Sequence, residues 1–276
     1  MPLFEMPSLA EWTTEWNAEW NRRPVVGSGF RSLDRLLPRG GLTRGSLVEW
    51  LGDDDVAGAT SLAAAVGIAV AGSVATGGTI LVVDRGGRFH PPAVMPWLAA
   101  AGDDGGFRPQ CIVARPARDD DEVWTIDQAL RCPGVTVVLA WPRQVHPTAM
   151  RRWQLAARSS QAVGMLVRPG RARREPSWAM HRIAVTPVAD GALGSRRLRL
   201  ALLDGPWSGG SFAGHERSVE MMLDLVRGRE AVAGGHSLVR MPHRFRSQPV
   251  NLPPPVRLPP QATLPSQEGA LACRAS

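Results

Sequence analysis

Short apolar runs alternate with helix-like segments along most of this chain, and that order restricts the possible folds more than any other feature. The runs lie at residues 46–51, 79–84, 110–114, 135–140 and 162–167. Helical patterns follow four of them, at residues 59–75, 92–101, 119–131 and 147–159. Parallel strands need long connections, which are usually helices, so this alternation predicts an α/β fold: a mostly parallel sheet with helices on both faces.

The remaining segments are expected to extend or flank this core. Two longer runs, residues 178–188 and 196–203, alternate in hydrophobicity and predict an antiparallel edge to the sheet. One more helix is expected at residues 215–229. The stretch from residue 241 onward is rich in Pro and Arg and cannot bury enough apolar area to fold, so disorder or polyproline II is expected. The expected parts are an N-terminal helix (1–23), a core (24–210), a C-terminal helix (211–240) and a tail (241–276).

A tryptophan stripe marks the N-terminal segment. Trp12, Trp16 and Trp20 are spaced four residues apart, so they share one face of a helix that should end near Pro24. Two interpretations stay open. The stripe packs against the core of this protein, or it forms a binding surface for a partner protein.

The basic charge of the chain is carried by arginine alone and is unevenly spread. Residues 1–142 hold 12 Arg and 17 acidic residues, a net −5, whereas residues 143–276 hold 20 Arg and 8 acidic residues, a net +12. Arginine is always charged and binds phosphate through two hydrogen bonds, which favours nucleic-acid contact. A GC-rich genome would also replace lysine by arginine, but it would not place the positive charge in the second half.

The cysteines and the N-terminus predict where the chain works. Three cysteines without CxxC spacing favour a reducing cytoplasm and predict no zinc site. No secretory signal is expected, and no apolar run is long enough to span a membrane. The six histidines have no metal-ligand spacing, and no nucleophile elbow is visible. No metal ion or cofactor is therefore expected.

The expected strand at residues 46–51 runs directly into a Gly-rich turn and a helix, which is the local context of a phosphate-binding loop. Ala59 stands where a lysine would reach the phosphates, and three aspartates lie in the loop. Their repulsion of a triphosphate should outweigh the roughly 0.3–1 kcal/mol that a helix dipole offers. The motif has four residues between its two glycines, whereas this chain has five. The motif positions of this degenerate loop are Gly52, Gly58, Ala59 and Thr60.

The carboxylate that would hold Mg²⁺ is missing as well. A Walker B aspartate should end the expected strand at residues 135–140, but Ala140 and Trp141 stand there. Asp84 ends another strand as an isolated carboxylate. Because Arg85 lies beside it, Asp84 is interpreted as an ordinary solvated strand end.

The segment at residues 25–49 resembles the run that precedes the phosphate loop of RecA. Over about residues 24–210 the chain is more closely similar to the ImuA family, which comprises RecA-related proteins of bacterial mutagenesis cassettes. The elements that carry the two resemblances are Leu33-Asp34, Gly40-Gly41-Leu42, Gly45, the degenerate loop, residues 138–142, residues 151–157 and Arg168-Pro169.

This resemblance implies a RecA-like ATPase core and a role in SOS-type DNA damage tolerance, that is, in translesion synthesis. ImuA-like proteins act with ImuB, an inactive homologue of Y-family polymerases, and with an error-prone replicative-type polymerase; RecA is a further expected partner. The catalytic glutamate of RecA follows the strand that here ends at Asp84, and this chain has Arg85 and Gly86 there. The resemblance therefore implies a pseudo-ATPase that acts as an adaptor.

In RecA-like cores the loops after the strands contact single-stranded DNA, and one such loop here is rich in arginine. Arginines can hold phosphates while an aromatic ring stacks on a base. The other interpretation is a solvated loop whose arginines only keep the protein soluble, with its tryptophan in the core. The candidate DNA-binding residues are Arg168, Arg171, Arg173, Arg174 and Trp178.

Two other functions stay open on the sequence. One is a divergent ATPase that uses non-standard residues such as Asp84. The other is a negative regulator of RecA filaments that associates through the N-terminal helix. Both alternatives have the same expected fold as the adaptor. They differ from it only in the function of the degenerate loop region and of the N-terminal helix.

Overall fold

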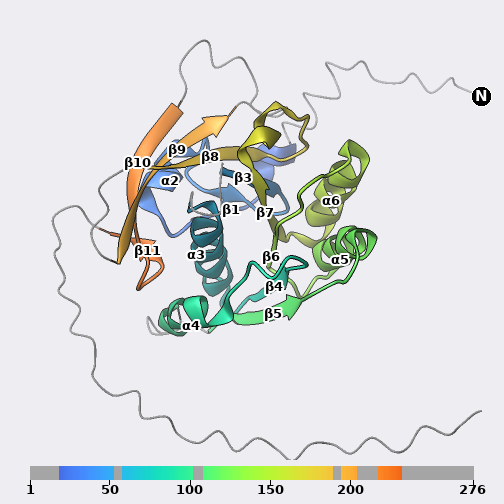
Figure 1. The fold of residues 1–276 in the computed structure, drawn as a ribbon, viewed down its shortest axis with the longest axis horizontal. Helices are drawn as coiled ribbons and strands as arrows, with labels where there is room; N and C mark the ends of the chain where they lie inside the picture. Colours follow the sequence, from blue (N-terminus) through green and yellow to red (C-terminus); the bar gives the residue numbers. More distant parts are fainter. Residues whose placement is uncertain (1–18, 53–57, 102–107, 189–193, 204–216, 232–276) are drawn as a thin grey trace, which may run out of the picture. The chain divides into compact units, whose positions relative to one another are not determined.

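The computed structural model describes residues 19–52, 58–101, 108–188, 194–203 and 217–231 (Figure 1). These ranges lie within one compact unit, Met1–Gly235. They form a nine-stranded mixed sheet with helices on both faces and a separate two-stranded sheet of β1 (Val25–Val26) and β2 (Leu42–Thr43). The predicted α/β class, with a mostly parallel sheet and an antiparallel edge, is confirmed.

Six neighbouring strands of the described sheet are parallel, and three more extend it on one side. The order across the sheet is β11-β10-β9-β8-β3-β7-β6-β4-β5. The parallel strands are β3 (Leu47–Gly52), β4 (Thr79–Val83), β5 (Gln110–Ala114), β6 (Val137–Ala140), β7 (Val163–Pro169) and β8 (His181–Pro187). The antiparallel strands are β9 (Ser195–Leu203), β10 (Arg217–Asp224) and β11 (Arg229–Glu230). The predicted run at residues 178–188 is thus antiparallel to β9 but parallel to β3.

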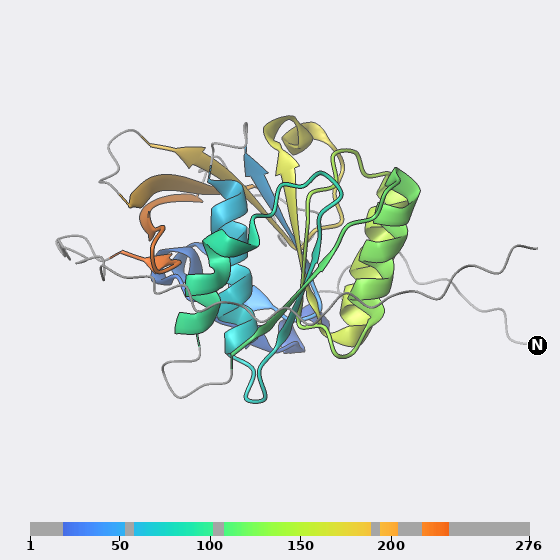
Figure 2. The ribbon, with the colours of Figure 1, turned by 60° about the horizontal axis from the view of Figure 1, so that its bottom comes forward.

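Helices cover both faces of the sheet (Figure 2). Each helical layer packs against the sheet in its own apolar core. On one face lie α2 (Arg31–Leu36), α3 (Ala59–Gly72) and α4 (Pro91–Ala100); on the other lie α5 (Asp119–Arg131) and α6 (Pro147–Ser160). Side chains alternate along a strand, so β3 supplies both cores: Val48 and Trp50 enter the first and Leu47 the second.

Small residues let α3 lie close to the middle of the sheet. Ten of its fourteen residues are buried, five of them alanines. A Cβ added at Gly67 would lie 3.3 Å from Val137 on β6, so the helix and the strand already pack closely at that point. This packing holds the first turn of α3 against the carboxyl edge of the sheet, next to the ends of β3 and β6.

The helix expected at residues 215–229 is wrong. The described part of that segment forms β10 and β11, and β10 pairs with β9 along its whole length. Val219, Met221 and Leu223 recur at every second residue, and Met221 and Leu223 are buried against the α3 side. The strand period of two therefore prevails over a helical period in this short segment. Gly228, with φ +62°, then turns the chain into β11.

The chain termini fall largely outside the described residues. Residues 19–22 are helical and the helix stops before Pro24, as predicted. Trp12, Trp16, the loop aspartates at residues 53–55 and the Pro-rich tail lie outside the described ranges.

Candidate functional site

The segments that follow β3, β4, β6 and β7 meet at one edge of the sheet, because the carboxyl ends of parallel strands share an edge. Ligands of open α/β sheets bind in such places. A cavity of about 230 Å³ lies there. Four arginines and no acidic residue occur among the described residues of its wall, which are Gly52, Ala59, Thr60, Arg88, Trp141, Arg143, Val167, Arg168, Pro169 and Arg171.

The first turn of α3 has the backbone of an anion site without the lysine. Gly58 is the N-cap residue with φ +83°, a left-handed conformation that glycine adopts at no steric cost. A Cβ at Gly58 would also lie only 2.8 Å from Cδ2 of Leu198 on β9. Ala59 is 3% exposed, so a buried methyl group occupies the lysine position. Three of the four predicted loop positions, Gly52, Ala59 and Thr60, thus line the cavity, and the described part of its wall holds no lysine.

A direct hydrogen bond joins Trp141, which follows β6, to Thr60 in the first turn of α3. The Trp141 Nε1–H donates to Thr60 Oγ1 over 3.0 Å. Trp141 follows β6, is buried, and its ring centroid lies 6.2 Å from that of Phe89. In P-loop ATPases a hydroxyl at the Thr60 position and a Walker B carboxylate together bind Mg²⁺. If the predicted correspondence to P-loop proteins holds, an indole stands here in place of that carboxylate and contacts the hydroxyl itself, a pairing that the sequence did not predict.

Asp84 is buried, so the prediction of a solvated strand end is wrong. Its carboxylate accepts backbone hydrogen bonds from Arg88 N (2.7 Å) and Phe89 N (3.1 Å), and Arg115 Nε lies 3.8 Å away. These bonds shape the turn after β4, which brings Arg88 to the cavity. Asp84 therefore acts on the site through the turn that it stabilises.

Arg85, next in the chain, holds the acidic first turn of α5. It forms ion pairs with Asp119 and, at 3.6 Å, with Glu122. Burial raises the pKa of Glu122, and the neighbouring charge of Arg85 acts in the opposite direction. Arg85 thus neutralises part of the acidic first turn of α5. No group of three potential metal ligands occurs within the described ranges.

Arg168 was predicted to contact DNA from an exposed loop, but the residue is only 2% exposed, and just its Nε–H, at the cavity wall, has no acceptor among the described residues. Its guanidinium pairs with Glu49 Oε1 at 2.7 Å and with Glu175. Glu49 is fully buried on β3, and its Oε2 accepts from Arg182 Nε at 2.7 Å. Buried charges persist only when they are paired and hydrogen-bonded, so Arg168 belongs to an internal network.

The same network anchors the segment that carries the other candidate arginines. Arg182 Nη2 donates to the carbonyl of Ala172 at 2.7 Å. That residue lies in a short 3₁₀ helix, η1 (Gly170–Arg174), in the segment that was expected to be a loop. The carboxylate of Glu49 thus fixes η1 to the interior of the sheet through Arg182.

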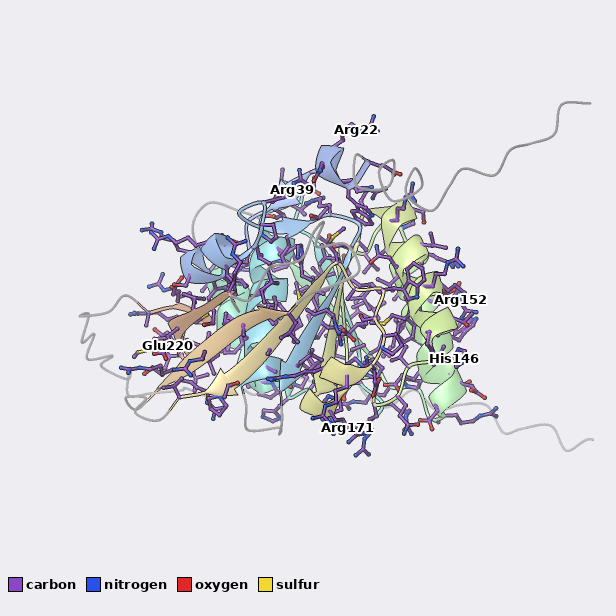
Figure 3. All side chains as sticks on the ribbon, turned by 90° about the horizontal axis from the view of Figure 1, so that it is seen from above. Arg22, Arg39, His146, Arg152, Arg171 and Glu220 are labelled. Atoms are coloured by element: carbon purple, nitrogen blue, oxygen red, sulfur yellow. The ribbon has the colours of Figure 1, made fainter. Side chains whose placement is uncertain are left out.

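The remaining arginines of η1 point into solvent. Arg171, Arg173 and Arg174 are exposed, and Arg171 also borders the cavity. Figure 3 shows Arg171 on the outside of the ribbon. Within the described ranges no ion pair joins their guanidinium groups to a carboxylate. The structure therefore brings three of the five predicted DNA-binding residues together on one fixed turn.

Trp178, the aromatic member of the set, is half-buried and packs against the α5–α6 core. The guanidinium carbon of Arg151 lies 5.3 Å from its ring centroid, a cation–π contact. The ring is therefore shared between the core and one arginine, which agrees better with the core interpretation than with base stacking.

Trp20, the described member of the tryptophan stripe, packs on its own protein. It is 5% exposed, and the Arg23 guanidinium lies 4.8 Å from its ring centroid. Arg39 donates to the carbonyls of Trp20, Asn21 and Arg23, and Glu19 pairs with Arg158 on α6. The partner-surface interpretation is therefore wrong for Trp20.

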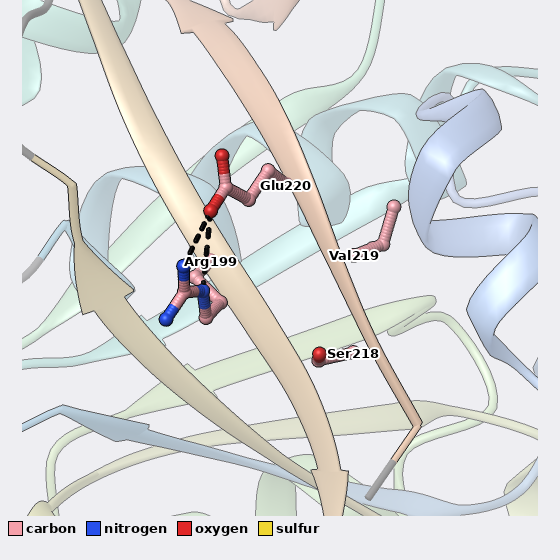
Figure 4. A pocket seen from close by; sticks show the side chains of 4 residues that line it. All are labelled: Arg199, Ser218, Val219 and Glu220. Atoms are coloured by element: carbon pink, nitrogen blue, oxygen red, sulfur yellow. Dashed lines mark hydrogen bonds and ion pairs between the residues drawn. The ribbon is translucent and has the colours of Figure 1, made fainter.

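A second hollow, of about 310 Å³, lies on the antiparallel edge (Figure 4). Arg199, Ser218, Val219 and Glu220 line it. Arg199 donates twice to Glu220 Oε1, at 3.2 and 2.6 Å, so the two charges neutralise each other. The smaller cavity at the carboxyl edge carries more unneutralised charge and is the better candidate site.

The comparisons with known proteins leave the chain without an assigned family. None of the described helices combines the length and hydrophobicity needed to cross a bilayer. No protein-family model matches the sequence, and no curated protein matches it significantly.

Proposed function

We propose that this chain is a non-catalytic, RecA-like accessory protein of SOS-type DNA damage tolerance in the cytoplasm. It serves translesion synthesis as an adaptor for an inactive Y-family polymerase homologue of the ImuB kind, together with RecA and an error-prone replicative-type polymerase. It also binds single-stranded DNA at the arginine-rich edge. The similarity of residues 24–210 to the ImuA family and the parallel core around β3 support this assignment.

The hydrogen bond between Trp141 and Thr60 carries the non-catalytic part of the proposal. ATP hydrolysis in P-loop proteins needs a lysine on the phosphates and a hydroxyl and carboxylate on Mg²⁺. Here Ala59 replaces the lysine, and Thr60 Oγ1 accepts a hydrogen bond from an indole. The cavity of about 230 Å³ is also smaller than the 300–1,000 Å³ of most small-molecule pockets.

An ATPase assay tests the catalytic half of the proposal. Purified full-length protein, with Mg²⁺ and with or without single-stranded DNA, should hydrolyse ATP no faster than a buffer control. Thr60→Val is the matched variant, since it keeps the side-chain shape and removes the hydroxyl. Hydrolysis above the control that Thr60→Val abolishes would establish the divergent ATPase instead.

The pathway half needs a test in cells. Deleting the gene should lower the frequency of ultraviolet-induced mutations, and a plasmid copy should restore it. A tagged copy should co-purify with an inactive Y-family polymerase homologue from the same cells, without added nucleotide. An unchanged mutation frequency in the deletion strain would reject the proposed pathway.

A further inference from the structure

We infer that the cavity at the carboxyl edge binds a backbone phosphate of single-stranded nucleic acid, at the place where P-loop proteins hold a nucleotide. The inference deepens the proposed function and rests on its DNA-binding part. It assigns a ligand of one chemical class, the singly charged phosphodiester, to a cavity whose ATP-binding groups are missing.

Positive groups reach the cavity from three different loops. Arg88 comes from the turn after β4, Arg143 from the segment after β6, and Arg171 from η1 after β7. The described part of the wall contains no carboxylate. Arg143 and Arg171 are exposed, and no ion pair within the described ranges neutralises either of them. An anion entering here would meet the uncompensated charges of Arg143 and Arg171.

Hydrogen-bond donors are available beside these charges. Thr60 accepts from Trp141 through Oγ1, and its hydroxyl proton stays free to donate, because a hydroxyl both donates and accepts. The first N–H groups of a helix such as α3 have no acceptor inside the helix. The Nε–H of Arg168 in the cavity wall is buried and has no acceptor among the described residues. The site is therefore rich in donors and poor in acceptors.

Size and charge favour a phosphodiester over a nucleoside triphosphate. The volume of about 230 Å³ is ample for one phosphate group and small for a whole nucleotide. In the described part of the wall, Ala59 stands where a triphosphate would need a lysine, and no carboxylate is present to hold the Mg²⁺ that a triphosphate brings.

The surface beyond the cavity suits a continuing strand. Arg171 belongs to both the cavity wall and the exposed face of η1, where Arg173 and Arg174 follow it. A strand with one phosphate in the cavity would therefore have further arginines beside its next phosphates, as in electrostatic grooves for single strands.

Fluorescence anisotropy with a labelled oligothymidylate tests the inference. The test variant is Arg143→Gln with Arg171→Gln, and the control is Arg31→Gln with Arg35→Gln, two exposed arginines on α2. Both variants lose the same charge. We expect the test variant to bind about tenfold more weakly, with a salt dependence reduced by about 1.4 in the log–log slope for two lost phosphate contacts. The control should change affinity less than about twofold.

The outcomes separate the inference from the proposed function. Equal affinity of the test and control variants, in a protein that binds the oligonucleotide, would reject the cavity site and leave DNA binding elsewhere. No binding by the unaltered protein would reject both. Competition identifies the source of the phosphate: an abasic oligonucleotide should displace the label, whereas Mg·ATP at the same phosphate concentration should not. Displacement by Mg·ATP that the test variant abolishes would make the cavity a nucleotide site.

Discussion

Arg168 and Arg171 are close neighbours in the sequence, yet they belong to different environments. Arg168 lies at the end of β7, is 2% exposed and pairs with Glu49 and Glu175. Arg171 lies on η1, is exposed and borders the cavity. The same guanidinium group is therefore an internal structural element in one place and a surface charge in the other. β7 keeps the side chain of Arg168 in the interior, whereas η1 exposes the side chain of Arg171 to solvent.

Breaking the buried network should have the largest effect. Glu49→Gln removes the charge shared by Arg168 and Arg182, and losing one partner of a buried ion pair typically costs about 3–5 kcal/mol. The free energy of unfolding from urea titration should fall by that amount. Arg171→Gln should change it by less than about 0.5 kcal/mol. Equal losses in both variants would remove the distinction between the two arginines.

The buried histidine His181 should make the stability of the protein depend on pH. Burial lowers the pKa of His181 to about 4, and the charge of Arg39 acts in the same direction. The unfolded chain takes up this proton near pH 6.5, so the contribution of His181 to stability is complete above that pH. This contribution to the free energy of unfolding falls by on the order of 3 kcal/mol as the pH drops from about 6.5 to about 4. Urea titrations across this range measure it.

A matched pair of variants isolates that effect. His181→Gln should flatten the pH dependence of unfolding between pH 6.5 and 4. His146→Gln, at the exposed N-cap of α6, should leave it in place. If His181→Gln keeps the full slope, another group causes it.

The exposed arginines should matter for binding and little for folding. Replacing Arg171, Arg173 and Arg174 together by Gln should weaken oligothymidylate binding by about tenfold and lower the salt slope by about 2. The urea midpoint should stay the same. Anisotropy measures the first result and circular dichroism the second. Unchanged affinity would mean that these arginines only solubilise the turn, and the protein would then be an adaptor alone.

The smallest expected effect concerns the hydrogen bond between Trp141 and Thr60. Trp141→Phe and Thr60→Val each remove one hydrogen-bond partner. A double-mutant cycle of unfolding free energies should give a coupling of about 0.5–1.5 kcal/mol. A coupling near zero would show that the two side chains are neighbours without a contributing bond.

Much of the fold was predictable because it depends on local patterns. The alternation of apolar runs and helical segments predicted the parallel strands, and the Gly-rich turn at Gly58 predicted the start of α3. The helix expected at residues 215–229 failed because the segment is short. Val219, Met221 and Leu223 fit a period of two in the sequence, but the pairing of β10 with β9 is what selects this period over a helical one.

The candidate site was predictable only in part. From their positions in the sequence, Ala59 and Ala140 predict the loss of ATP hydrolysis, which stays a prediction. The contact between Trp141 and Thr60 could not be foreseen, since it depends on β6 and α3 meeting across the sheet. Arg143 was also missed, because nothing in its sequence neighbourhood indicates that it faces the same cavity as Arg171.

The sequence by itself determined the class of the sheet, the glycine-capped first turn of α3 and the absence of a loop lysine. These features depend on periodicity and on residue identity at single positions. Only the tertiary structure decided which arginines are buried and which remain free to bind a ligand. Glu49 is 119 residues from Arg168 and 133 from Arg182, and no local pattern encodes pairing over such separations. Strand order brings these charges together, and desolvation then requires that they stay paired.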